Sequence, residues 1–239
     1  MIDFKVEKLL PDCEKFGLVL SGEQIEKLNA YGNLLLEWNE KINLTAITEP
    51  EEVLYKHFYD CLLFLDAVKV QNGARVIDVG TGAGFPGVVL KTARPDINIT
   101  LLDSLGKRIT FLENVLSELS LSGAAIHMRA EDGGRDAQLR EKFDIACARA
   151  VANLNVLSEY CVPFVKVGGV FVAMKGGEPQ AEVEGGTGAL KTLGCDLPQV
   201  ISKRLRENEK RSFIIAKKIS QTPPKYPRNS AKISKAALV

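Results

Sequence analysis

From Arg75 onward, the chain alternates short apolar runs with longer stretches whose apolar residues recur at helical spacing, such as Lys107–Leu119. Strands that alternate with helices predict a doubly wound α/β fold with a mostly parallel sheet. A polar turn separates the last two apolar runs, which predicts an antiparallel hairpin at one edge of the sheet. The expected strands are Arg75–Val79, Ile97–Leu102, Ala125–Met128, Phe143–Ala148, Val170–Met174, Leu197–Lys203 and Ser212–Ala216.

The first seventy residues predict helices and no strands. Ser21 and Gln24 have the spacing of a capping box, so a helix is expected to begin after Ser21. A second helix is expected from Pro50 to about Val68, because a proline followed by two glutamates suits a helix N-terminus. Asn39 and Asn43–Thr45 are interpreted as capping and turn residues between the two helices. The apolar residues that predict the first helix recur at spacings of three and four, at Ile25, Leu28, Tyr31, Leu35, Trp38 and Ile42.

These patterns divide the chain into an N-terminal helical cap (1–70), a sheet domain (71–220) and a basic C-terminal tail (221–239). Glu184–Gly188 interrupts a helix-like stretch with glycines, which predicts a flexible loop. The tail from Thr222 is rich in proline and lysine and has no apolar period. We therefore expect the tail to be partly extended or mobile.

The composition is that of an ordinary globular protein, with 46% apolar and 26% charged residues. No window approaches the ~20 uncharged apolar residues of a membrane span. The amphipathic, acidic start Met1–Glu7 does not resemble a secretory signal. The five cysteines are scattered and lack metal-ligand spacing to either histidine, which predicts buried thiols in a reducing cytosol and no metal site. A cytoplasmic location is expected.

The net charge of +1 conceals an uneven distribution along the chain. From Lys203 to the end there are eleven Lys and Arg against two acids, whereas the preceding 202 residues carry 20 basic and 28 acidic side chains. Such asymmetry is typical of a basic surface that binds a polyanion, and it also fits a solvated edge strand rich in lysine. Charge alone leaves both interpretations open.

The strongest local signal follows the first expected strand, where Gly80, Gly82 and Gly84 let the backbone approach a ligand closely before a helix begins. The spacing from Gly82 through Gly84 to Gly87 also matches the dinucleotide-binding fingerprint, which is weak by itself. Asp78 separates the possible ligands. A carboxylate there repels a pyrophosphate but complements the sulfonium and ammonium of S-adenosylmethionine. The sequence therefore favours S-adenosylmethionine over a nicotinamide dinucleotide.

Three further residues follow later strands of the predicted sheet. Asp103 closes the second strand, where a carboxylate accepts hydrogen bonds from ribose hydroxyls. Glu131 follows the third strand and is a candidate neighbour of adenine, with a solvated loop acid as the alternative. Arg149 follows the fourth strand in an apolar setting. Because arginine is rarely buried without a partner, we interpret it as a cofactor or substrate-phosphate contact, with a structural ion pair as the alternative.

The sequence lacks the motifs that several kinds of methyl acceptor require. The fourth strand lacks the Asn/Asp-Pro-Pro-aromatic turn of exocyclic-amine methylation, and Cys147 lacks the context of a pyrimidine-methylating nucleophile. No base set for oxygen acceptors assembles. Guanine N7 loses no proton on methylation, so proximity and orientation suffice without a general base. The sequence is consistent with that acceptor.

Taken together, these residues resemble the bacterial 16S rRNA guanine-N7 methyltransferase G family, also called glucose-inhibited division protein B. The resemblance runs from about Trp38 to Leu238. The glycine loop is shared by many methyltransferases, but its continuation into Phe-Pro-Gly makes the resemblance to this family more specific. The supporting segments are Trp38–Ala46, His57–Asp60, Asp78–Gly87, Leu102–Ser104 with Lys107 and Arg108, Arg129–Glu131, Ala148–Ala152 and Lys225–Arg228.

The resemblance implies a seven-stranded Rossmann-like (class I) methyltransferase domain and transfer of a methyl group from S-adenosylmethionine to guanine N7 in 16S rRNA. The expected partner is 16S rRNA or the small ribosomal subunit, and the chain is expected to be a monomer. Arg149 is the candidate catalytic residue at the reacting end. The implied RNA contacts are Lys107, Arg108, Lys225 and Arg228. The implied cofactor contacts are Asp78, Gly80, Gly82, Gly84, Phe85, Asp103, Ser104, Ala130, Glu131 and Arg149.

The sequence departs from the family pattern after Arg228, where the family commonly continues with Lys-Ala-Gly and this chain has Asn229–Lys235. Three alternatives remain at this point. A nicotinamide-dependent oxidoreductase would bind NAD in place of the methyl donor. A non-catalytic RNA-binding protein with this fold would bind RNA regardless of cofactor. A small-molecule methyltransferase would act independently of salt, unlike an enzyme that uses a basic tail.

Overall fold

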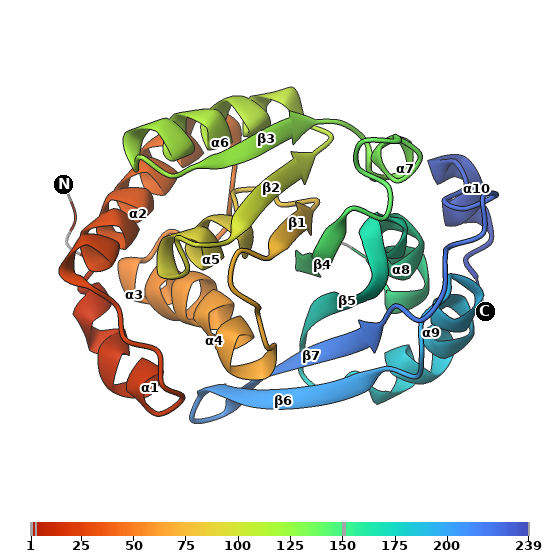
Figure 1. The fold of residues 1–239 in the computed structure, drawn as a ribbon. Helices are drawn as coiled ribbons and strands as arrows, with labels where there is room; N and C mark the ends of the chain where they lie inside the picture. The colour runs from red at the N-terminus through yellow and green to blue at the C-terminus, as the bar shows by residue number, and fades with distance from the viewer. Residues whose placement is uncertain (1, 3, 150–151, 239) are drawn as a thin grey trace.

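The computed structural model describes residue 2, residues 4–149 and residues 152–238. Its centre is a seven-stranded sheet with the order β3-β2-β1-β4-β5-β7-β6 (Figure 1). Strands β1 to β5 pair in parallel, and β7 lies antiparallel between β5 and β6. This confirms the predicted doubly wound fold and its edge hairpin. The strands are β1 (Arg75–Val79), β2 (Asn98–Asp103), β3 (Gly123–His127), β4 (Phe143–Arg149), β5 (Val165–Gly176), β6 (Gln199–Arg206) and β7 (Glu209–Lys217).

Short and long helices surround this sheet. No helix among the described residues is both long enough and apolar enough to cross a membrane. Ala150 and Val151 of the segment Ala148–Ala152 lie outside the described residues, as do Met1, Asp3 and Val239. The helices are η1 (Val6–Leu9), α1 (Leu10–Glu14), α2 (Gly22–Ile42), α3 (Pro50–Val53), η2 (Leu54–Tyr59), α4 (Asp60–Ala67), α5 (Gly87–Ala93), α6 (Gly106–Glu118), α7 (Ala130–Gly133), α8 (Leu154–Cys161), η3 (Val162–Phe164), α9 (Gln180–Thr192) and α10 (Ser230–Lys235).

Helix α2 of the N-terminal cap begins and ends where the sequence predicts. The Ser21 side chain accepts a hydrogen bond from the Gln24 amide, and the Gln24 side chain accepts one from the Ser21 amide, which completes the capping box. Helix α2 ends where Asn43 adopts a left-handed conformation with φ of 48°. The helix expected from Pro50 consists of three pieces, because the π-helical turn η2 separates α3 from α4. The sequence pattern did not indicate that turn.

The sheet has a separate hydrophobic core on each face, because successive residues of a strand point to opposite sides. The cap core lies between one face and the N-terminal helices, α5 and α6, and the tail core lies between the other face and α8, α9 and Tyr226. All five cysteines are buried and free, as predicted. The strands contribute Val76, Ile99, Leu101, Ile145, Cys147 and Val172 to the cap core, and Ile77, Leu102, Ala146, Ala148, Phe171 and Ala173 to the tail core.

Two predictions about irregular segments need correction. The prediction of a flexible loop at Glu184–Gly188 is wrong, because these residues lie inside helix α9. Gly186 faces α8, and a Cβ atom there would lie 2.7 Å from the Leu154 side chain, so the glycine permits the two helices to pack closely. The C-terminal tail is also more regular than expected. It contains helix α10, capped by the Asn229 side chain, which accepts a hydrogen bond from the Lys232 amide at 2.9 Å.

Candidate active site

A cavity of about 750 Å³ opens at the carboxyl ends of β1, β2 and β4. This is the point where the strand order reverses, at which open α/β sheets bind their ligands. The loop after β1 forms its floor, with φ of 70° at Gly80 and 60° at Gly82, values that favour glycine. The volume is typical of a site for a nucleotide-sized ligand.

Asp78 and Gly84 lie beneath the loop and do not line this cavity. Asp78 is fully buried, and its Oδ2 atom accepts hydrogen bonds from the Thr81 hydroxyl at 2.7 Å and the Gly87 amide at 2.8 Å. Burial raises the pKa of Asp78 to about 6. The carboxylate therefore shapes the loop from below, a structural role that the charge argument from sequence did not include.

Asp103 stands at the end of β2 with its side chain in the cavity wall. Its Oδ2 accepts a hydrogen bond from the Gly82 amide at 2.9 Å, and its Oδ1 accepts one from the Leu105 amide at 3.0 Å. Arg108 lies 3.3 Å from Oδ2. Each carboxylate oxygen has two acceptor positions, so Oδ1 retains one for a ligand hydroxyl. Ser104 lines the cavity beside it.

The opposite wall comes from the first turn of α7 and from α8. Ala130 and Glu131 begin α7 directly after β3, and both line the cavity together with Met128 and Tyr160. Glu131 is 8% exposed. The structure thus brings Asp103, Ser104, Ala130 and Glu131 together around one end of the cavity, as the sequence predicted for a nucleoside site.

Arg149 lies at the other end, where the N-terminal cap meets β4. Its guanidinium donates hydrogen bonds to the Lys56 carbonyl and to Asp60 Oδ2, both at 3.0 Å. It also stacks 4.8 Å above the Phe85 ring and lines the cavity. The fully buried Asp60 holds a second arginine, Arg211, through its other oxygen. Arg149 therefore forms the structural ion pair of the alternative interpretation, and it also lines the cavity, so its contact with a cofactor or substrate phosphate stays a prediction.

His57 and Asp60 are functional candidates that the sequence argument did not single out. His57 Nδ1 lies 3.1 Å from both Arg149 Nη2 and the Lys56 carbonyl oxygen, and its Nε2 lies 2.9 Å from the Thr45 hydroxyl. Burial, followed by the charge of Arg149, lowers the pKa of His57 to about 3. The available signal was the His57–Asp60 segment of the family resemblance.

The candidate RNA contacts do not form one cluster. Lys107 and Lys225 are exposed, and Arg108 lies on the cavity rim beside Asp103. Arg228 is bound to Glu159, with its Nη2 atom 2.7 Å from Oε2. The basic C-terminal region is also less free than its sequence indicates, because several of its cations form ion pairs. These pairs are Lys203–Asp66, Arg206–Glu52, Lys210–Glu178, Arg211–Asp60, Lys218–Glu141 and Arg228–Glu159.

The strand order, with β7 antiparallel, and the glycine-floored cavity that ends at Asp103 define a class I S-adenosylmethionine-dependent methyltransferase. Solved structures of this class share the fold. A methyltransferase from Pyrococcus furiosus aligns with a TM-score of 0.57 and 11% identity, covering 79% of this chain and 95% of that one. A geranyl diphosphate methyltransferase in complex with GPP and sinefungin aligns with a TM-score of 0.56 and 13% identity, covering 83% and 100%.

The sequence narrows this class to one family. Residues 24–212 match the family model of rRNA small subunit methyltransferase G (GidB). The ribosomal RNA small subunit methyltransferase G of Clostridium beijerinckii is 49% identical over 93% of this chain and 94% of its own. That of Acetivibrio thermocellus is 48% identical over 99% and 98%. The chain belongs to the rRNA small subunit methyltransferase G family.

Proposed function

We propose that this protein transfers a methyl group from S-adenosylmethionine to N7 of a guanine in 16S rRNA. The observation that carries the proposal is the cavity itself, which joins a nucleoside-type end at Asp103 and Glu131 to a cationic end at Arg149. The names of the relatives support small-subunit rRNA as the substrate. The exposed cations Lys107 and Lys225, which lie on separate elements, support a polyanionic substrate.

The residues around the cavity fit the cofactor. Oδ1 of Asp103 keeps an acceptor position for a ribose hydroxyl, and the backbone of Gly80 and Gly82 leaves the floor open. Glu131, on the opposite wall, is placed to accept a hydrogen bond from an amino group of the base. Bound S-adenosylmethionine supplies an electrophilic methyl group on a sulfonium.

The reacting end supports an acceptor that loses no proton. His57 is the nearest candidate base, but its pKa of about 3 keeps it neutral and makes it a weak proton acceptor. Arg149 is held in one orientation by Lys56, Asp60 and Phe85, so its charge is fixed toward the cavity. Such a site works by positioning the nucleophile and by its fixed electrostatic field. Guanine N7 requires only this.

The decisive experiment supplies labelled S-adenosylmethionine and 16S rRNA that lacks its native methylations, followed by digestion to nucleosides and mass spectrometry. Label in 7-methylguanosine supports the proposal. Label in another nucleoside overturns the acceptor atom and keeps the cofactor. The same reaction with assembled small subunits tests which form of the rRNA is the substrate. A thermal shift with NAD and none with the methyl donor would favour an oxidoreductase.

We also propose that the enzyme acts as a monomer in the cytoplasm, where the rRNA of bacteria is made. Light scattering after size exclusion measures the oligomeric state directly. A mass near 26.1 kDa is expected for the chain.

A further inference from the structure

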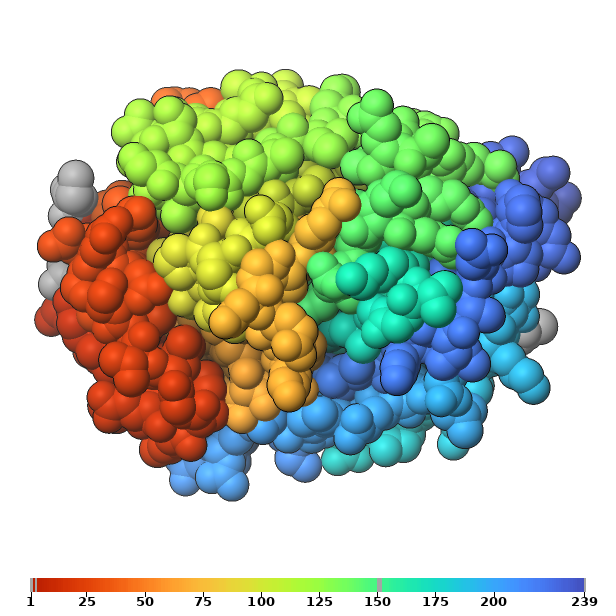
Figure 2. Space-filling model, in the orientation of Figure 1, coloured from red at the N-terminus to blue at the C-terminus, as the bar shows by residue number. Residues whose placement is uncertain are grey.

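The C-terminal tail runs back along the molecule from the end of β7 to the active-site cavity. After Lys217 the chain follows α8, where the C-terminal residues (blue) lie against atoms of residues near 130–140 (green) in Figure 2. At the end of this path Ser230 begins α10 and lines the cavity together with Tyr160 of α8. The Ser234 side chain lies close to the Tyr160 hydroxyl. The tail thus contributes Ser230 to the lining of the cavity.

The start of the tail is held by one buried and one half-buried cation, Lys218 and Arg140. Lys218 is fully buried, and its ammonium donates hydrogen bonds to the Thr222 hydroxyl at 2.7 Å and to Glu141 at 3.1 Å. Arg140 donates to the carbonyls of Tyr226 and Thr222, both at 2.8 Å. These bonds join the tail backbone to the segment that precedes β4. The part of the tail after Tyr226, which reaches the cavity, is held by other contacts.

That distal part is held by Arg228. Its backbone amide donates to Glu159 Oε1 at 2.7 Å, and its Nε and Nη2 atoms lie 2.9 Å from Oε1 and 2.7 Å from Oε2. Glu159 is fully buried in α8, next to Tyr160 in the sequence. Both oxygens of the buried carboxylate are therefore satisfied by one tail residue. Ser230 follows two residues later, so this pair fixes the position of the tail where it meets the cavity.

We infer that Thr222–Leu238 is a strap that completes the cofactor cavity, and that Arg228 is a positioning residue that holds the strap through Glu159. The strap also carries the exposed side chains of Lys225, Lys232 and Lys235. Cofactor binding and contact with a polyanion therefore share one segment, and the seating of that segment links the two. This inference rests on the proposed function, because it takes the cavity to be the S-adenosylmethionine site.

The test measures the dissociation constant of S-adenosylhomocysteine by calorimetry on the full chain. Arg228→Ala is expected to weaken binding about tenfold, because the strap loses the contact that seats it. Since that variant also leaves a buried carboxylate unpaired, the double variant Arg228→Ala with Glu159→Gln is measured beside it. It is expected to show the same loss of affinity. Arg228→Lys is expected to restore only part of the affinity, since lysine lacks the two-pronged geometry of arginine.

Lys232→Ala is the matched control, because it removes a cation from the strap without touching Glu159. It is expected to raise the Michaelis constant for RNA and to leave the S-adenosylhomocysteine affinity unchanged. Hydrogen exchange adds a readout that is independent of activity. Ligand is expected to slow exchange in residues 222–238 of the wild type and much less in the double variant.

Unchanged S-adenosylhomocysteine affinity in the folded double variant would overturn the inference. So would a variant Arg228→Ala whose only defect is weaker RNA binding with a salt slope lower by about one, since that marks a phosphate contact. Failure of the wild type to bind S-adenosylhomocysteine would overturn the proposed function itself. The wild-type titration therefore separates the two failures.

Discussion

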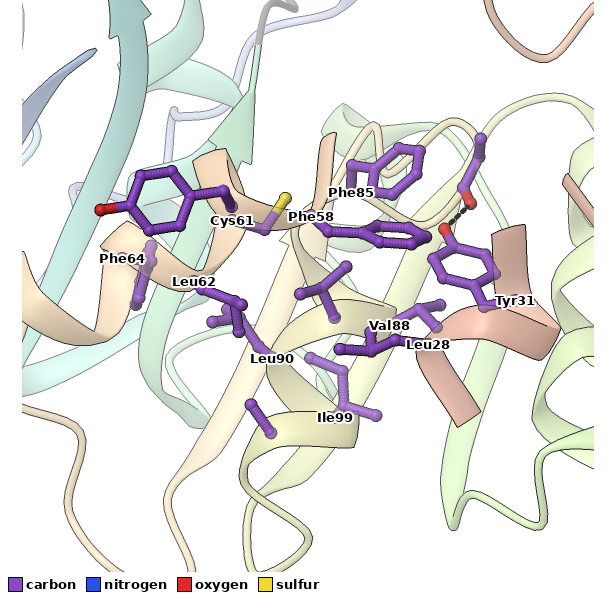
Figure 3. Close-up of a cluster of buried hydrophobic side chains, with 14 of the residues drawn as sticks. Leu28, Tyr31, Phe58, Cys61, Leu62, Phe64, Phe85, Val88, Leu90 and Ile99 are labelled. Carbon is purple, nitrogen blue, oxygen red and sulfur yellow. Dashed lines mark hydrogen bonds between the residues drawn. The ribbon is translucent and has the colours of Figure 1, made fainter. Parts of the chain in front are cut away.

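The two ends of the chain reach the same cavity from opposite faces of the sheet and are held by different chemistry. Where the N-terminal cap meets the glycine loop, it is held by aromatic packing, in which Tyr31 stacks on Phe58 with ring centroids 5.6 Å apart and lies 5.3 Å from Phe85 (Figure 3). A single hydrogen bond from Tyr31 to the Ala83 carbonyl joins the cap to the glycine loop. The tail is attached by charged groups, through Lys218 and Arg228.

This difference shows how each attachment tolerates change. Apolar packing depends on volume and shape, so adding or removing a single carbon atom lowers stability. Buried charge depends on keeping both partners, because losing one leaves an unpaired group in a medium that does not solvate it. Shape changes are therefore expected to damage the contact between Tyr31 and the glycine loop most, and charge changes the contacts of Lys218 and Arg228.

Of these variants, Gly84→Ala on the cap side is expected to lower the free energy of unfolding most. Gly84 has φ of 99°, and an added Cβ would lie 2.6 Å from Val88 Cγ2 and 2.8 Å from the Tyr31 hydroxyl. Strain and overpacking together predict a loss of about 3 kcal/mol of stability, measured by denaturant unfolding. Gly73→Ala is the control, because it has φ of 68° but no atom within 4 Å of the added Cβ. Equal losses in the two variants would reject the packing argument.

On the tail side, Lys218→Met is expected to lower stability by about 2 kcal/mol, since it leaves the carbonyls of Val162 and Val165 without this donor and removes one of the donors to Glu141. Its neighbour Lys217 is exposed, so Lys217→Met removes the same charge at little cost. Chemical denaturation of both variants measures the difference. A stability of Lys218→Met equal to that of Lys217→Met would show that buried charge does not hold the tail.

A third prediction concerns acid, which acts on the cap side through His57. Its pKa is about 3 in the folded protein against 6.5 for an ordinary histidine, so its contribution to stability is present above pH 6.5 and is lost as pH falls toward 3. One proton gives a slope of about 1.4 kcal/mol per pH unit in that window.

His57→Gln is expected to remove this slope when unfolding free energies of both proteins are compared between pH 6.5 and 4.5. The comparison isolates His57, because Asp78 is present in both proteins. The raised pKa of Asp78, about 6, acts in the opposite direction, since its contribution is lost as pH rises through that value. Parallel pH curves for wild type and variant would contradict the prediction.

The smallest effect is expected for Tyr31→Phe, which keeps the ring but loses the hydrogen bond to Ala83. A loss of about 1 kcal/mol is expected. Combining it with Arg228→Ala sharpens the comparison, because the two residues act on opposite faces of the sheet. The losses of unfolding free energy caused by the two substitutions are expected to add within about 0.5 kcal/mol. A larger coupling would mean that the cap and the tail stabilise each other through the cavity.

The same difference explains what could be predicted from the sequence. Helix α2 was predicted because an amphipathic helix repeats its apolar residues, and the strands because they are short and apolar. The attachment of the tail leaves no such period. It depends on single cations such as Arg140 and Arg228, whose partners are carbonyl groups and a carboxylate far away in the sequence.

The candidate site divides in the same way. Asp103, Glu131 and Arg149 were predicted because each follows a strand, and strand ends of a parallel sheet meet at one edge. The His57 and Asp60 contacts to Arg149 could not be predicted from spacing, because they join residues about ninety positions apart. Gly186 was misread as a loop residue because only the packing partner Leu154 explains a glycine inside that helix.

The π-helical turn η2 (Leu54–Tyr59) has a consequence for the permitted length of the chain. A π turn holds an extra residue, and each residue of a helix advances its phase by about 100°. Deleting one residue from η2 would therefore rotate α4 about its axis and turn Cys61 and Phe64 away from the cap core. Insertions and deletions in this segment are thus expected to be more harmful than substitutions at its exposed positions. In homologous chains, the number of residues in this segment is expected to vary less than their identity.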